Sequence, residues 1–353
     1  MTYFSNITKI HQFIISITIL CFSIAQALTN QTPPNVPNTC LNTDATDSNK
    51  ATSNSPTIKS TKETDLTESM KRTMAPLARL IPNEKLFVSE PNPAWFGNGA
   101  NTPDDPAWTN SNWLKSRFHF SFAEYNNHRN SHFGILRVMN DDLVQPHRGF
   151  GTHPHRNMEI ITYIVHGELA HEDSMGNGES LGRGSIQFMT AGTGITHSEF
   201  NHGDEPLRFI QTWIVPRQSG LKPSYGSYNA GQDCDGKKNI LQHLASDVDR
   251  TDIETPVKIA QDVNCYAAEL EMNKSTRVEL GEKRQAYMLC VEGELEVNGT
   301  TLKKHDAMEI HGGEDKTSLE IKATGVEETE NGNVAHFLMF DMPFVPGSGR
   351  SDM

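Results

Sequence analysis

Two short groups of metal-binding residue types carry the clearest chemical signal in this sequence. His153 and His155 are separated by one residue, and His197 and Glu199 have the same spacing. Side chains at i and i+2 of a β-strand share a face, so each pair on a strand would point in one direction. Two such pairs facing each other inside one barrel would place three imidazoles and a carboxylate around a point.

This donor set predicts a site for a first-row divalent metal ion. Four protein ligands fill only part of an octahedron, which leaves two positions for a substrate and dioxygen. A closed structural zinc site would favour thiolates, and no cysteine lies near either pair in the sequence. Either pair alone is weak evidence, because histidines on strands are more often core or surface residues than ligands. The prediction rests on both pairs together and on the glycines that precede them.

The elements that would position these pairs are short β-strands. After Ile81, stretches of β-branched and aromatic residues are separated by Gly, Asn and Asp at close intervals, and long helical periodicity is hard to find. This pattern predicts an all-β fold of the sandwich or barrel type. The apolar stretches are residues 118–122, 134–139, 160–165, 208–215, 287–291 and 337–340.

The chain is long enough for two β domains. Its 353 residues exceed the length of one average domain. A stretch rich in Gly, Ser, Tyr and Asp at 219–238, without an apolar run, predicts the joint between the domains. We therefore expect a first domain with the metal site at 81–230, a second at 231–345, and a frayed tail at 346–353.

Composition and charge exclude several classes of protein. The 36% hydrophobic and 21% charged residues are not typical of collagen, a coiled coil or a polytopic membrane protein. A net charge of −13 repels phosphate backbones and anionic lipids, so no nucleic-acid partner is expected. Five cysteines without a C-x-x-C pair indicate neither a zinc knuckle, a redox couple nor a disulfide scaffold.

Residues 1–27 have the layout of a secretory signal peptide. Lys9 precedes an apolar run at 13–24, and Ala25 and Ala27 supply the small residues that a signal peptidase reads. The run is shorter than the ~20 apolar residues that span a bilayer. We expect a periplasmic or secreted protein without a membrane span after cleavage; an uncleaved anchor, or a cytoplasmic protein, is the alternative. Residues 28–80 are polar and predict a disordered, flexible tether.

Three longer motifs surround the candidate ligands. They are THPHRNMEI at 152–160, DSMGN at 173–177 and AGTGITHSE at 191–199. They closely resemble the pirin family of the cupin superfamily, and among its members the bacterial pirin-like quercetin 2,3-dioxygenases. The resemblance runs from about Trp113 through 140–142 to 213–216, and more loosely to 340–343.

The resemblance implies a bicupin fold, with two tandem jelly-roll-like β-barrels and one divalent metal ion in the N-terminal barrel. The positions that match the family's ligands are His153, His155, His197 and Glu199. Fe(II) is the ion that the family leads us to expect, although imidazole and carboxylate donors also accept Ni, Co, Mn, Cu or Zn.

Two carboxylates are candidates for catalytic roles. The general cupin pattern takes its carboxylate ligand from the first motif, where Glu159 stands, whereas pirins resemble one another in using the second-motif residue, here Glu199. Glu159 is therefore a candidate for a role beside the metal, and its alternative role is a salt bridge to a nearby arginine. Glu199 could also accept a proton from the substrate as a general base.

The second half of the chain has a cupin-like strand and turn at 281–295 but no H-x-H pair. Its histidines His305 and His311 have no opposing pair. We expect this barrel to be structural and to bind no metal.

The resemblance leads to two hypotheses of function. The first is a monomeric, metal-dependent dioxygenase that opens the heterocycle of flavonols such as quercetin, with a small phenolic substrate and O2 as reactants. Phe120, Phe122 and Phe188 would then line the pocket or, alternatively, form ordinary barrel core. The second is a non-enzymatic, metal-responsive binding or regulatory protein with a protein partner, and a vestigial metal barrel is a third reading.

The signal-like segment gives a direct prediction. Cleavage after Ala27 should leave a mature protein that begins at Leu28, because Ala25 and Ala27 follow the apolar run at once. N-terminal sequencing of the exported protein measures this, and a product that retains Met1 would contradict it.

Overall fold

The computed structural model describes residues 77–98, 112–232 and 238–346 of the chain. The signal peptide at 1–27, most of the tether at 28–80 and nearly all of the tail at 346–353 lie outside these residues, so those predictions stay predictions. No helix among the described residues is long and apolar enough to cross a membrane. The elements described below all belong to one compact unit, Pro76–Met353.

The described residues form strands and three short 3-10 helices, which confirms the all-β prediction. The strands of the first half are β2 (Phe87–Ser89), β3 (Leu114–Phe118), β4 (Leu136–Val144), β5 (Gly149–His155), β6 (Glu159–His166), β7 (Leu169–Asp173), β8 (Gly178–Leu181), β9 (Ile186–Thr190), β10 (Ile195–Phe200), β11 (Leu207–Ile214) and β12 (Ser224–Tyr228). The helices are η1 (Asn83–Lys85), η2 (Pro93–Phe96) and η3 (Ala230–Gln232).

The second half begins its own set of strands after η3. They are β13 (Gln242–Asp247), β14 (Val257–Ile259), β15 (Asn264–Leu270), β16 (Ser275–Leu280), β17 (Arg284–Glu292), β18 (Glu294–Val297), β19 (Thr300–Lys303), β20 (Ala307–His311), β21 (Thr317–Gly325), β22 (Glu327–Thr329) and β23 (Gly332–Pro343).

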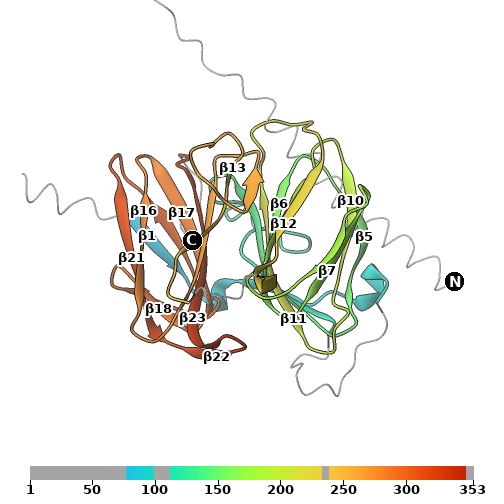
Figure 1. Cartoon of the computed structure of the whole chain (residues 1–353), viewed down its shortest axis with the longest axis horizontal. Coiled ribbons are helices and arrows are strands. Elements are labelled where there is room, and N and C mark those ends of the chain that lie inside the picture. The colour runs from blue at the N-terminus through green and yellow to red at the C-terminus, as the bar shows by residue number, and fades with distance from the viewer. Residues whose placement is uncertain (1–76, 99–111, 233–237, 347–353) are drawn as a thin grey trace, which may run out of the picture. The chain divides into compact units, whose positions relative to one another are not determined.

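Each half pairs one large sheet with one small sheet, which is the bicupin arrangement expected from the sequence. The first half has a seven-stranded sheet, β12-β9-β6-β11-β4-β3-β2, and a four-stranded sheet, β5-β10-β7-β8. The second half has an eight-stranded sheet, to which β1 (Leu77–Ile81) also belongs and which contains β1-β20-β17-β23-β15-β13-β14, and a four-stranded sheet, β16-β21-β18-β19. Figure 1 shows the green and yellow strands of the first barrel and the orange and red strands of the second.

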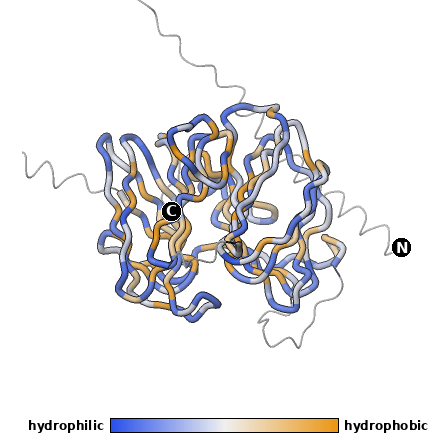
Figure 2. Tube along the Cα trace, viewed as in Figure 1, coloured by the Kyte–Doolittle hydropathy of each residue, from blue (hydrophilic) through white to orange (hydrophobic). Residues whose placement is uncertain are grey.

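The seven-stranded sheet is buried on both faces. On β6, Ile161, Tyr163 and Val165 share a cluster with residues of the second barrel's large sheet, such as Tyr287 and Leu338. Ile160 and Ile164 alternate with them and point into the first barrel. Burial on both faces explains why β6 and β11 are apolar runs instead of alternating strands. Figure 2 shows such hydrophobic segments beside hydrophilic ones along the chain.

The interiors of the two barrels are packed differently. The second barrel holds one apolar cluster, in which Met288, Cys290 and Phe337 take part. The first barrel holds two separate apolar clusters. Phe209 and Trp213 lie on the same face of β11, but Phe209 belongs to one cluster and Trp213 to the other. Gln211 lies between these two positions on the same face. The first barrel therefore carries a polar layer between two apolar ones.

Residues 77–80, which we expected in the flexible tether, form strand β1 (Leu77–Ile81) instead. Strand β1 pairs antiparallel with β20 of the second barrel, and Figure 1 shows this blue strand among orange and red ones. The side chain of Arg79 also pairs with Glu309. The expected boundary at residue 80 was wrong, because a single short edge strand has too few residues for its alternating pattern to distinguish it from the polar segment before it.

The stretch at 219–238, expected to be the joint between the two domains, contains strand β12. Strand β12 pairs with β9 at the edge of the seven-stranded sheet. Its side chains are exposed or half-buried, so the strand has no apolar run that a sequence pattern would reveal.

Strand β1 covers the edge of β20, which would otherwise be unpaired. Its residue Ile81 inserts into the core between the large sheets, with 3% of its surface exposed. Deletion of residues 1–81 should therefore lower the melting temperature and promote aggregation, because the unpaired edge of β20 would be free to pair with other chains. Ile81→Ala should reduce the free energy of unfolding by ~2–5 kcal/mol. Thermal melting and light scattering measure both effects.

Deletion of residues 1–75, which keeps β1, is the matched control and should behave like the full chain. Equal stability of the two deletion variants would show that β1 contributes nothing to the second barrel.

Candidate metal centre

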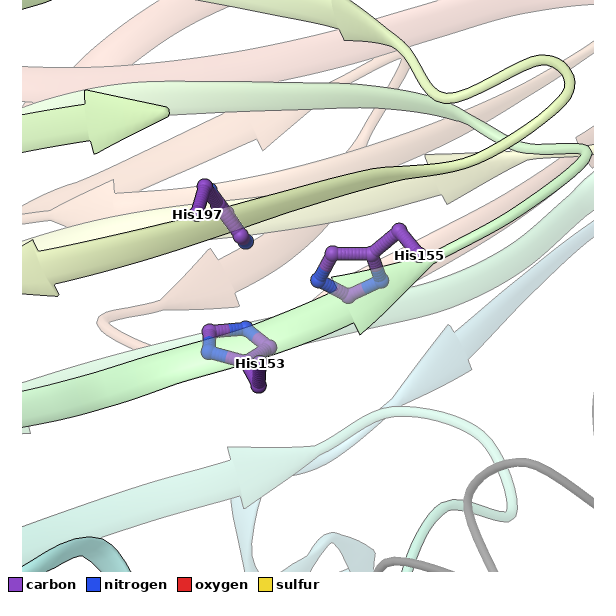
Figure 3. A group of neighbouring side chains, drawn as sticks. All are labelled: His153, His155 and His197. Atoms are coloured by element: carbon purple, nitrogen blue, oxygen red, sulfur yellow. The ribbon is translucent and has the colours of Figure 1, made fainter. Parts of the chain in front are cut away.

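Three of the predicted ligands converge on neighbouring strands. His153 and His155 lie on β5, and His197 lies on the adjacent antiparallel strand β10, directly opposite His153. Figure 3 shows His153 and His155 on one strand and His197 on the next, with the three side chains close together. Their ring centroids are 4.5–4.8 Å apart. One nitrogen from each ring lies within 4.8 Å of the others, which is close enough for all three to hold one ion.

A β-bulge in β5 aims His153 into the barrel. His197 pairs with His153 but Glu199 pairs with Phe150, so β5 has one residue more than β10 between these points. Phe150 packs on the apolar cluster around Trp113, while His153 joins the other imidazoles. In a regular strand, Phe150 and His153 are three residues apart and would point to opposite faces. The extra residue of the bulge lets both side chains point into the barrel.

The hydrogen bonds of the three histidines leave lone pairs for a metal. His153 donates its Nδ1–H to the carbonyl of Gly151 at 2.8 Å, which leaves Nε2 unprotonated in the neutral ring. Within the described part of the chain, three buried nitrogen atoms lack a hydrogen-bond partner. They are both ring nitrogens of His155 and the Nε2 of His197. Buried polar atoms are rarely left unpaired, so these nitrogens are suited to bind a metal ion.

Burial also keeps these imidazoles neutral. Desolvation lowers the pKa of all three rings, and lowers it most strongly for His155 and His197. The neighbouring imidazoles add to this effect, because each protonated ring would repel the next. A neutral ring is the form that binds metal, so little free energy is needed to remove protons before binding.

Glu199 lies two residues beyond His197 on the same inward face of β10, and its side chain is 2% exposed. Its Oε2 accepts a hydrogen bond from Gln211 at 2.6 Å, and its Oε1 accepts one from Thr162 at 3.3 Å. Burial raises the pKa of Glu199 to about 7, although these two hydrogen bonds oppose the shift. The structure groups Glu199 with His197, but not with His153 and His155.

The third member of that second group is His171 of β7, which the sequence analysis did not single out. His171 is buried and pairs across the sheet with Glu199. Asp142, which the sequence brought in only as part of the resemblance at 140–142, is a buried carboxyl on β4 whose pKa burial raises to about 8. The signal for His171 was present, since it lies two residues before the DSMGN motif, but a lone histidine on a strand is not distinctive.

Aromatic residues close one side of the cluster. Trp213 meets His155 edge to face with centroids 4.8 Å apart, and Phe122 packs against Trp213 at 5.3 Å. Of the three phenylalanines for which pocket wall and barrel core were the two alternatives, Phe122 lies in this position. Phe120 and Phe188 belong to the core between the two large sheets.

The structure does not bring Glu159 into this cluster. Glu159 lies on β6 one residue before Ile160, so it points away from the barrel interior. Its Oε2 accepts hydrogen bonds from Thr190 at 2.8 Å and from the backbone N–H of Ala260 at 3.3 Å. Burial raises the pKa of Glu159, against the effect of these bonds and of Arg217.

No group of three potential ligands occurs in the second barrel, as far as the described residues go. His305 faces the first barrel, where its Nδ1 lies 2.6 Å from Asp141. His311 packs against Phe133 with ring centroids 5.2 Å apart. The two histidines thus serve contacts between the barrels.

Two glycines let the backbone approach closely around the site. A Cβ on Gly192, which has φ +44°, would lie 2.0 Å from the carbonyl oxygen of Leu221. A Cβ on Gly149 would lie 2.4 Å from the carbonyl oxygen of Glu199 and so would separate β5 from β10. Both positions therefore require glycine.

Comparison with known proteins agrees with this geometry. The family model for pirin matches residues 102–214, and the model for the quercetinase C-terminal cupin domain matches residues 244–342. A protein named quercetin 2,3-dioxygenase from Escherichia coli is 35% identical over 237 residues, which cover 66% of this chain and 94% of that protein. A pirin-like protein from Caulobacter vibrioides is 37% identical and covers 62% of this chain and 90% of its own length.

Solved structures show the same fold. The structure of YhhW from Escherichia coli matches with a TM-score of 0.60 and 30% identity, over 76% of this chain and 99% of that one. A structure of this bacterial pirin in complex with nickel(II) matches equally well, at 29% identity over 76% of this chain and all of that one. The chain belongs to the pirin family of cupin proteins.

Proposed function

We propose that the protein is a metal-dependent dioxygenase that opens the heterocycle of flavonols such as quercetin with O2 and releases carbon monoxide. The observation that carries this proposal is the set of buried, unpartnered imidazole nitrogens that converge inside the first barrel. The names of several relatives point to the reaction, since they include quercetin 2,3-dioxygenases. The alternative, a metal-binding protein without turnover, shares the same site.

His153, His155, His197 and Glu199 would hold one metal ion, for which we propose Fe(II). The nickel(II) complex of the Escherichia coli pirin supports the assignment of a divalent ion. When bound, the ion acts as a Lewis acid that stabilises the ionised 3-hydroxyl of the flavonol and supports the reaction with O2. His153 is only half-buried, whereas His155 and His197 are buried, so the substrate would approach beside His153.

The chain's own contribution is to orient groups and to hold a proton. The Glu199 carboxylate would accept the proton of the flavonol hydroxyl, and burial, which raises the pKa of Glu199, favours its protonated form after the transfer. Gln211 and Thr162 fix its two oxygens. Trp213 and Phe122 form an apolar wall that excludes water and suits a flat aromatic substrate.

The ligand assignment predicts about one metal ion per chain, because the converging nitrogens occur in one barrel. His155→Ala should bring the metal content, measured by elemental analysis after anaerobic purification, to near zero. His311→Ala, in the second barrel, is the control and should keep the metal. Retention of the metal by the first variant and its loss from the second would place the site in the other barrel.

Glu199 tests the reaction separately from metal binding. Glu199→Gln keeps the shape and one neutral oxygen but removes the charge and the basicity. We expect this variant to retain much of its metal and to lose nearly all flavonol turnover, whereas His153→Ala should lose both. Turnover is measured in air as the loss of flavonol absorbance, with each metal restored in turn.

Glu159→Gln is the matched control for this experiment. Because Glu159 faces away from the barrel interior, this variant should keep its metal and show a smaller defect. Normal turnover by Glu199→Gln, together with metal loss from Glu159→Gln, would move the carboxylate ligand to the first motif. Stoichiometric metal without any flavonol turnover in the parent protein would favour the non-enzymatic alternative.

A further inference from the structure

One buried histidine beside the metal centre has no role in the function proposed above. His171 lies on β7, next to β10, and only 1% of its surface is exposed. It pairs across the sheet with Glu199, and Asp173, two residues further along β7, pairs with His197. Directly opposed residues of an antiparallel pair share a face, so His171 and Asp173 stand beside both second-motif ligands.

The ring of His171 is held in one orientation. It stacks on the ring of Tyr225, with centroids 4.5 Å apart and an interplanar angle of 13°. Its Nδ1 lies 3.5 Å from the Nδ1 of His197, and also 3.5 Å from the Nε2 of Gln187. Its Nε2 is buried without a hydrogen-bond partner among the described residues and lies 3.7 Å from the Oδ2 of Asp173, whose side chain is also buried.

The positions of the protons follow from these contacts. The Nδ1 of His197 faces His171, so its Nε2 is the nitrogen left for the metal. A metal binds an unprotonated nitrogen, and a neutral imidazole carries one proton, so the proton of His197 is on Nδ1. His197 then donates to the Nδ1 of His171, which must carry its own proton on Nε2, the nitrogen that lies 3.7 Å from the Asp173 carboxylate.

The Asp173 carboxylate is fixed in turn by the DSMGN turn that the sequence motif contains. Its Oδ1 accepts hydrogen bonds from the backbone N–H groups of Met175 at 2.8 Å and Asn177 at 3.1 Å. Its Oδ2 accepts one from the Nδ2 of Asn177 at 2.8 Å. A carboxylate with this many donors keeps its position and its negative charge, which attracts the Nε2–H of His171.

We propose that Asp173 and His171 position His197 for metal binding, because together they fix its tautomer and ring orientation. Metal-binding histidines commonly donate their second N–H to a carboxylate or carbonyl. Here an imidazole, itself oriented by a carboxylate, takes that place. This inference rests on the assignment of His197 as a ligand in the proposed function, and His171 and Asp173 are positioning residues.

Variants of the full-length protein titrated with Co(II) test the proposal. His171→Leu removes the acceptor for the His197 N–H and should weaken Co(II) binding by ~10–100-fold, measured by competition with a chelator. It should also change the visible spectrum of the bound Co(II), which reports on ligand geometry. His171→Asn places an amide oxygen near the former Nδ1, so it should recover most of the affinity and the parent spectrum.

Asp173→Asn keeps the size of the side chain and removes its charge, so it should weaken Co(II) binding in the same direction as His171→Leu. Glu172→Gln, on the exposed side of the same strand, removes an equal charge and should bind Co(II) like the parent protein. This pair of variants keeps the proposal testable even if His171→Leu does not fold.

Three outcomes would overturn the proposal. In the first, His171→Leu and Asp173→Asn bind Co(II) with the parent affinity and spectrum. In the second, His171→Asn is as weak as His171→Leu, which would make His171 itself a ligand. In the third, His153→Ala binds Co(II) as the parent does, and then the ligand assignment of the proposed function fails as well. Loss of binding in His153→Ala, with unchanged His171 variants, rejects only the positioning role.

Discussion

The burial of the seven-stranded sheet on both faces is the constraint on which the rest of this structure depends. One face packs against the large sheet of the second barrel, and the other face forms a wall of the metal centre. On β6, Tyr163 belongs to the first face and Thr162 to the second. A slip of one residue in the register of β6 would exchange these two sets, so that Thr162 would enter the apolar interface and Tyr163 the metal centre. The stability of the interface between the barrels therefore enforces the geometry of the site.

The polar layer inside the first barrel is costly to bury, and the structure compensates for it in two ways. Its imidazoles are neutral, since desolvation lowers their pKa, and the Glu199 carboxyl is held by Gln211 and Thr162. The remaining unpartnered nitrogens on His155 and His197 have no such compensation, and a bound cation would supply it. The second barrel contains an apolar interior in place of this layer and so serves as a support.

Polar contacts between the barrels, like the apolar interface, hold the two large sheets in one arrangement. Arg208 forms two hydrogen bonds of 2.8 Å with Asp141, which also contacts His305 of the second barrel. From the same face of the seven-stranded sheet, Tyr163 contacts His336 of the second barrel at 2.9 Å. Because such buried pairs tolerate little displacement, they fix how the large sheets meet. The strand β11 that carries Arg208 also carries Gln211 and Trp213, so the interface and the site are built on one rigid element.

The sequence by itself determined the fold class and pointed to three histidines that converge, because alternation along a strand is a local property that the spacing of His153 and His155 and of His197 and Glu199 records directly. It also led us to expect a structural second barrel, through the absence of a second H-x-H pair. Only the tertiary structure decided that Glu159 faces Thr190 and Ala260, that His171 lies beside His197, and that residues 77–81 complete the second barrel. These features depend on which strands become neighbours and on which faces are covered, and strand pairing between distant segments leaves no periodic signal in the chain.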